Sequence, residues 1–257
     1  MMKDKADKHE DHKMKKSEHE KHFKGKAISD IILGGQDGLV NVLGVVLGVA
    51  SATNNPFIVL VAGLAATFAE TISMAAVAYT STKADRDYYM SERVLEEEEV
   101  KNIPEHETEE IREIYAKKGF KGKLLDDVVR TITSNKKVWI DTMMTEELNL
   151  SLKYGDSPIR NAIIVFISTL IGSVLPLIPF LIAPTGLISV NGAIVYSLVV
   201  SIAVLFIVGV VKAKFTIGNW FISGLELAVI GTVAAGTGYL VGLGLGKAFG
   251  TNVAGVG

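Results

Sequence analysis

FIVLVAGLAATFAETISMAAVAYT, residues 57–80, contains a single charged residue, Glu70. A helix needs about 20 mostly apolar residues to cross the hydrocarbon core of a bilayer, and this stretch is long enough. Residues 83–158, which follow it, are rich in Lys, Arg, Asp and Glu. The stretch therefore predicts a membrane-spanning helix that leads directly into a water-exposed region.

Four more stretches have the same apolar character, at residues 28–51, 161–183, 192–211 and 221–249. The last one is rich in glycine, which lets membrane helices approach each other closely. The sequence thus predicts an all-α membrane protein with five transmembrane helices. Residues 27–82 hold the first two spans and residues 159–250 hold the last three.

Acidic residues are segregated along the chain. Six of the 28 lie in residues 1–26 and seventeen in residues 83–153, and the remaining five are Asp30, Asp37, Glu70, Asp156 and Glu226. Residues 1–26 have few apolar side chains, so we expect a disordered cytoplasmic tail rather than a signal peptide. The chain has no cysteine, which excludes thiolate metal ligands and disulfides.

Basic residues flank the predicted spans on alternate sides. Lys24 and Lys26 precede the first span, Lys83 and Arg86 follow the second, Arg160 precedes the third, and Lys212 and Lys214 follow the fourth. The connections 54–56 and 184–191 carry no charge. Because basic residues mark the cytoplasmic side, we expect the N-terminus and residues 83–158 in the cytoplasm and the C-terminus outside or in a lumen.

The region between the second and third spans is predicted to be a three-helix cytoplasmic insert. Residues 83–101 continue the second span, Pro104 breaks that helix, and residues 105–118 form the next one. Residues 124–152 form the third, with an interruption expected near residues 134–135. Apolar residues recur at helical spacing and predict a small core: Ile111, Ile114, Tyr115, Leu124, Leu125, Val128, Val129 and Ile132.

Asp37 and Glu70 are carboxylates within predicted spans, where such groups are costly and usually functional. Met74 lies one helical turn beyond Glu70, on the same face. Carboxylate oxygen combined with thioether sulfur suits Fe²⁺ or Mn²⁺ better than Ca²⁺ or Mg²⁺. The alternative is that Asp37 caps or kinks a helix, Glu70 pairs with a neighbouring helix and Met74 is packing.

The insert carries carboxylates at i,i+3 spacing, which project from one face of a helix. The pairs are Glu96 with Glu99 and Glu107 with Glu110, and Met143, Met144 and Glu147 follow in the third helix. Like charges so placed repel each other, so a cation would stabilise them. The alternative is an acidic face that is simply solvated.

The sequence does not decide the roles of two further features. Glu226 in the fifth span fits either a proton-linked role or a pore-lining or interface position. His9, His12, His19 and His22 in the tail include two i,i+3 pairs, and imidazole binds Zn, Ni, Cu and Fe. The tail fits a solvated leader equally well.

Several segments together resemble the vacuolar iron transporter family. They are DGLVNVLGVVLGVA (37–50), ETISMAAVAYTSTKADRDYY (70–89), IYAKKGF (114–120), MMTEELNL (143–150) and GSVLPLIPFL (172–181). They occur in the family's order, and the resemblance covers about residues 27–249. It implies a five-helix homodimer that moves Fe²⁺, and often Mn²⁺ or other divalent ions such as Co²⁺ or Zn²⁺, out of the cytosol in exchange for protons.

The resemblance also implies roles for individual residues. Asp37 and Met74 match ion-site residues of the membrane path. The cytoplasmic metal-binding helices are matched by Glu96, Glu99, Glu107, Glu110 and Glu147, with Met143 or Met144. The implied partners are the lipid bilayer, divalent metal ions, protons and a second copy of the chain, with no nucleic acid.

Other classes of function are less consistent with the sequence. A membrane-anchored ferritin-like oxidase would use Glu-x-x-His pairs, yet Glu99 and Glu110 stand at those positions after Glu96 and Glu107. A membrane scaffold without cargo would not need Asp37 and Glu70. We therefore expect a transporter and not an enzyme, in a plasma membrane if the source is prokaryotic and in a vacuole-like organelle if it is eukaryotic.

Overall fold

A computed structural model describes residues 2–151, 157–216 and 218–250, with the backbone alone for residues 2–26, and these residues contain helices and no strand. Five helical segments are long and apolar enough to cross a membrane: Ala27–Thr53, Pro56–Asn102, Pro158–Thr185, Val190–Phe215 and Trp220–Ala248. They correspond one to one with the predicted spans, so the all-α, five-span prediction is confirmed.

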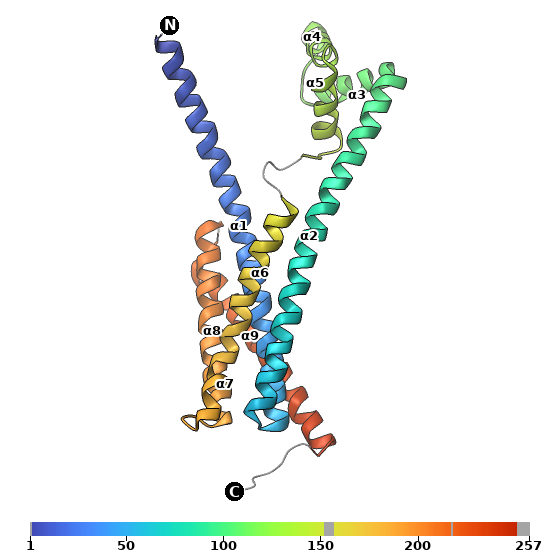
Figure 1. Cartoon of the computed structure of the whole chain (residues 1–257). Helices are drawn as coiled ribbons and strands as arrows, with labels where there is room; N and C mark the ends of the chain where they lie inside the picture. The colour runs from blue at the N-terminus through green and yellow to red at the C-terminus, as the bar shows by residue number, and fades with distance from the viewer. Residues whose placement is uncertain (1, 152–156, 217, 251–257) are drawn as a thin grey trace. The chain divides into compact units, whose positions relative to one another are not determined.

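The chain divides into two compact units (Figure 1). The first comprises residues 1–79 and 158–257, and the second comprises residues 80–157. The helices of the first unit are α1 (Met2–Thr53), the start of α2 (Pro56–Asn102), α6 (Pro158–Val174), α7 (Ile178–Ile182), α8 (Val190–Phe215) and α9 (Trp220–Ala248). Helix α1 packs along α6 and α9, and α8 packs along α9.

Glycine sets the spacing of the helices around α1. A Cβ added at Gly172 of α6 would lie 2.9 Å from the carbonyl carbon of Gly35 and closer still to its oxygen. Gly238 and Gly242 of α9 face Gly44 and Gly48 of α1 in the same way. Such backbone contact replaces the hydrophobic effect as the force that joins helices in lipid.

Gly172→Ala is expected to lower the stability of the folded protein by about 1–3 kcal/mol, because the new methyl group forces two backbones apart. Gly244→Ala is the matched control, since a Cβ there meets nothing within 4 Å and alanine favours the helix. Melting temperatures in detergent measure both effects. Equal melting temperatures for the two variants would contradict the close contact of α1 and α6.

The outer faces of the spans carry large apolar side chains. Phe57, Val61 and Phe68 on α2 and Leu240 on α9 are all more than half exposed in the single chain. In water this much scattered apolar surface would be unfavourable, but in lipid it needs no cover. The exposed positions therefore agree with a membrane-embedded unit.

The third span is not one continuous helix. Helix α6 ends at Val174 and is followed by a 3-10 turn η2 (Leu175–Leu177), by α7 and by a second turn η3 (Ala183–Thr185). Pro176 and Pro179 cause the break, because proline lacks an N–H and its ring clashes with the preceding turn. The hydroxyl of Ser197 on α8 donates a hydrogen bond to the Pro176 carbonyl at 2.8 Å.

The second unit contains the end of α2, then α3 (Pro104–Lys117), α4 (Gly122–Thr133), α5 (Lys136–Thr142) and a π-helical turn η1 (Met143–Glu147). The predicted third helix of the insert is thus divided, at the expected place. The Asn135 side chain accepts hydrogen bonds from the N–H groups of Lys137 and Val138 and so starts α5, as an N-cap residue does.

A continuous core holds the second unit together. It consists of Val100, Ile111, Leu125, Val129, Ile132, Trp139, Ile140, Met143 and Met144. The sequence predicted four of these, but it wrongly placed Leu124 in the core, where the side chain is 60% exposed. Ion pairs join the helices around it: Arg93 with Asp141, Arg112 with Asp126, and Lys118 with Glu146.

Helix α1 begins at Met2, so the backbone of residues 2–26 is helical where the sequence predicted a disordered tail. This segment has no proline, its single glycine is Gly25, and the Lys and Glu that dominate it are good helix formers. The many charged residues of this segment leave too few apolar side chains for a buried core, but they are compatible with a helix. The four tail histidines belong to this segment, whose side chains lie outside the description.

Candidate metal sites

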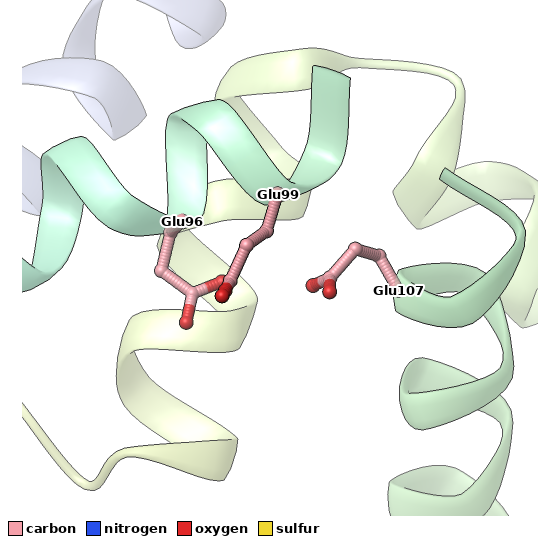
Figure 2. Close-up of side chains that lie close together, drawn as sticks. All are labelled: Glu96, Glu99 and Glu107. Atoms are coloured by element: carbon pink, nitrogen blue, oxygen red, sulfur yellow. The ribbon is translucent and has the colours of Figure 1, made fainter. Parts of the chain in front are cut away.

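The corner between α2 and α3 brings acidic side chains together. Helix α2 ends at Asn102, and Pro104 occupies the first turn of α3, where its missing N–H costs nothing. Glu96 and Glu99 lie on the last turns of α2 and Glu107 on the first turn of α3. One carboxylate oxygen from each lies within 4.8 Å of those of the other two (Figure 2).

Two of these carboxylates are withdrawn from water. Glu96 is 4% exposed and Glu107 is 2% exposed, whereas Glu99 is exposed. One oxygen of Glu96 and one of Glu107 are buried without a hydrogen-bond partner. Buried carboxylate oxygens are normally hydrogen-bonded or bound to a metal, so this oxygen-rich set fits a divalent cation.

Burial and mutual repulsion shift the titration of the cluster. Burial, followed by the charges of Glu147, Glu107, Glu99 and Glu110, raises the pKa of Glu96 to about 7. Burial, followed by the charges of Glu110, Glu99 and Glu147, raises the pKa of Glu107 to about 7. The pKa of Glu147 is raised by burial, Glu110 and Glu99. Without a cation, Glu96 and Glu107 therefore hold protons near neutral pH.

These shifts predict how stability depends on pH. Because folding raises both carboxyl pKa values, the metal-free protein should lose stability as pH rises from about 4.5 to about 7. A divalent cation binds the deprotonated form, so Mn²⁺ should raise the melting temperature more at about pH 8 than at about pH 5.5. Differential scanning fluorimetry checks this, and an Mn²⁺ effect independent of pH would contradict it.

The other predicted residues of the insert lie in different surroundings. Glu110 is half-buried on α3, one turn beyond Glu107, and its Oε1 lies 3.5 Å from Nε2 of His106. Glu147 is exposed, and its charge acts on Glu96 and Glu107. Met143 and Met144 are fully buried and belong to the apolar core. Their role as metal ligands stays a prediction.

A second group of polar side chains lies within the spans. The carboxylate of Asp37 on α1 interacts with Glu70 on α2 and with Asn41, one turn further along α1. The Asn41 amide donates a hydrogen bond to the Glu70 carboxylate at 3.0 Å. The structure therefore brings Asp37 and Glu70 together, and it adds Asn41, which the sequence analysis missed.

Met74 and Glu226 complete the predicted set in the spans. Met74 is half-buried on α2, one turn beyond Glu70. Glu226 of α9 forms an ion pair with Lys212 of α8 at 3.9 Å, and both side chains are substantially exposed. A pairing with a basic residue at the end of α8 favours the interface position for Glu226.

Known proteins are similar to this chain over most of its length. The sequence profile of the VIT family matches residues 28–243. Vacuolar iron transporter 2 of Oryza sativa subsp. japonica is 34% identical over 221 residues, which is 86% of this chain and 88% of the relative. Vacuolar iron transporter 1 of Arabidopsis thaliana is 34% identical over 221 residues, with 86% and 87% covered.

A vacuolar iron transporter of Toxoplasma gondii is 35% identical over 228 residues, which is 85% of this chain and 76% of the relative. The region matched by the family profile contains all five apolar helical segments apart from Ala27 and the last residues of the fifth. It also contains both groups of carboxylates. The resemblance seen in the sequence motifs is thus confirmed, and the chain belongs to the VIT family.

Proposed function

We propose that this chain carries divalent metal, Fe²⁺ and Mn²⁺, out of the cytosol in exchange for protons. The observation that carries the proposal is the contact between Asp37 and Glu70 on adjacent apolar helices. Two carboxylates at membrane depth repel each other, and a bound cation relieves that repulsion. The names of the relatives, vacuolar iron transporters, support the same function.

Within this proposal, the acidic cluster of the second unit collects the metal ions before transport. Glu96, Glu99 and Glu107 provide hard oxygen ligands, and the protonation of Glu96 and Glu107 near neutral pH makes metal and protons compete for the site. No Glu-x-x-His pair stands in this cluster, and His106 is an exposed partner of Glu110. The cluster therefore does not favour the ferritin-like oxidase.

Metal uptake into proteoliposomes with an imposed pH gradient tests the proposal. We expect Fe²⁺ and Mn²⁺ flux that rises with the gradient, with Co²⁺ and Zn²⁺ as competitors. Flux that ignores the gradient would refute proton exchange. Absence of flux, together with oxidation of Fe²⁺ by the purified protein, would instead support the oxidase.

The proposed orientation places the N-terminus and residues 83–158 in the cytoplasm. Because the native chain has no cysteine, Ser134→Cys introduces a unique label between α4 and α5, and Ser189→Cys does so before α8. A membrane-impermeant thiol reagent applied to intact cells should label the second variant and spare the first. The reverse pattern would invert the topology and hence the direction of export.

A homodimer is also proposed, in line with the family resemblance. In the second unit, Tyr88 and Leu95 of α2 are seven residues apart on one helix face, and they are 55% and 50% exposed. A second copy of the chain would cover these apolar side chains, which otherwise face water. The mass of the detergent-solubilised protein by light scattering decides between monomer and dimer.

A further inference from the structure

Five hydroxyl groups of the described spans are buried without a hydrogen-bond partner. Four of them belong to Thr67 and Thr71 on α2 and to Thr169 and Ser173 on α6, and the fifth belongs to Ser201 on α8. All five residues are at most 1% exposed. A hydroxyl left unpaired in an apolar environment is unfavourable, and a membrane provides no water to compensate.

A helix offers threonine an easy alternative, and this protein uses it elsewhere. Thr232 and Thr237 of α9 each donate to the carbonyl four residues earlier, at 2.7 and 2.8 Å. Such bonds back to the same helix are common for Ser and Thr. The hydroxyls of Thr67, Thr71 and Thr169 are therefore turned away from an available partner.

The α2 pair lies beside the carboxylates. At 100° per residue, Thr67, Glu70, Thr71 and Met74 all fall within about one third of the helix circumference. Glu70 of this face contacts Asn41 and Asp37 of α1. The two threonine hydroxyls thus lie on the face of α2 that holds the membrane carboxylate.

The α6 pair lies against the same stretch of α1. A Cβ added at Gly34 would lie 2.8 Å from Oγ1 of Thr169, and a Cβ added at Gly38 would lie 2.5 Å from Oγ of Ser173. Gly38 is the residue next to Asp37. Residues 34–41 of α1 are therefore flanked by unpaired hydroxyls from α6 and by Glu70 with its neighbouring hydroxyls from α2.

We propose that the four hydroxyls of α2 and α6 line the passage of the cation beside Asp37 and Glu70, where their oxygens replace part of its water shell. Hydroxyl oxygen is a hard ligand that suits a partly dehydrated divalent cation. The carboxylates of Asp37 and Glu70 and the amide of Asn41 provide charge but too few oxygen ligands to surround a cation. The hydroxyls supply further oxygen ligands. This inference rests on the proposed transport function and names further residues that determine its rate and selectivity.

Valine substitution separates this role from a structural one, because Val has the shape of Thr without the hydroxyl. In Thr67→Val/Thr71→Val, removal of two unpaired hydroxyls should leave the melting temperature unchanged or raised. Mn²⁺ flux at low metal concentration should nevertheless fall about tenfold, since contacts to a charged group are lost. Thr67→Ser/Thr71→Ser keeps the hydroxyls and should restore most of the flux.

Thr232→Val is the matched control, because its hydroxyl is already bonded within α9; it should not change the flux. Thr169→Val/Ser173→Ala tests the α6 pair in the same way as the α2 double variant. The inference is overturned if flux per molecule is unchanged in both double variants. It is also overturned if the melting temperature of Thr67→Val/Thr71→Val falls together with its flux and Thr67→Ser/Thr71→Ser does not restore the flux.

Wild-type flux is measured first in the same proteoliposomes. Absence of wild-type flux refutes the proposed function, and this inference with it. Wild-type flux together with unaffected valine variants refutes the inference alone.

Discussion

Asp37→Asn is expected to give a folded protein whose metal flux is reduced by about a hundredfold or more. The substitution keeps the volume of the side chain and one oxygen, but it removes the charge that faces Glu70. Removal of one ionic partner from a site of low dielectric costs about 3 kcal/mol or more, which corresponds to roughly a hundredfold. Initial rates of Mn²⁺ uptake into proteoliposomes, per molecule reconstituted, measure the effect.

Glu226→Gln is the control for Asp37→Asn, because it also neutralises a carboxylate in an apolar helix. Glu226 pairs with the exposed Lys212, and exposed pairs contribute little, so its flux should stay close to that of the wild type. If Asp37 served only to cap or pack α1, Asp37→Asn would lower the melting temperature and leave the flux per molecule intact. That result would remove Asp37 from the path.

The second large effect is expected in the acidic cluster. Changing Glu96, Glu99, Glu107 and Glu110 together to Gln keeps the side-chain shapes and removes four charges. Metal affinity of this site should fall by about a hundredfold or more, because each neutral amide oxygen binds a divalent cation far more weakly than a carboxylate. Isothermal titration of the full chain with Mn²⁺ gives the number of sites and their affinity.

The same substitutions should also stabilise the metal-free protein above about pH 7. Both the cost of burying charged carboxylates and their mutual repulsion, which raise the pKa of Glu96 and Glu107, are then gone. The control neutralises four exposed acids on the same helices, Glu97, Glu98, Glu105 and Glu109. It changes the net charge equally and should leave metal binding intact. An equal loss of metal affinity in both variants would mean that the net negative charge attracts the metal and that no specific site binds it.

The fold could be predicted because lipid imposes a simple rule on the sequence. Each span requires about 20 apolar residues, and five such stretches stand out on any inspection. The core of the insert was harder to predict. Leu124 and Leu125 are equally apolar, and periodicity alone could not decide which of them faces the core. The π-helical turn at Met143–Glu147 has no sequence pattern that distinguishes it from an α-helix.

The candidate sites could be predicted in part. The i,i+3 spacing placed Glu96 with Glu99 on one helix face, but the angle between α2 and α3 decides whether Glu107 joins them. That angle depends on how the core packs beneath Pro104, and the hydrophobic periodicity of the sequence does not predict it. Asn41 was missed because an amide at a span position is not as costly as a carboxylate. The unpaired hydroxyls could not be foreseen, because threonine usually bonds to its own helix.

The proline break in the third span has a consequence for how the chain is inserted during synthesis. The Pro176 carbonyl takes a hydrogen bond from Ser197, 21 residues later in the sequence. A nascent chain that released the third span into lipid alone would expose that carbonyl without this donor, at a cost of several kcal/mol. The third and fourth spans should therefore leave the translocation machinery as a paired hairpin, and a ribosome stalled between them should hold the third span back.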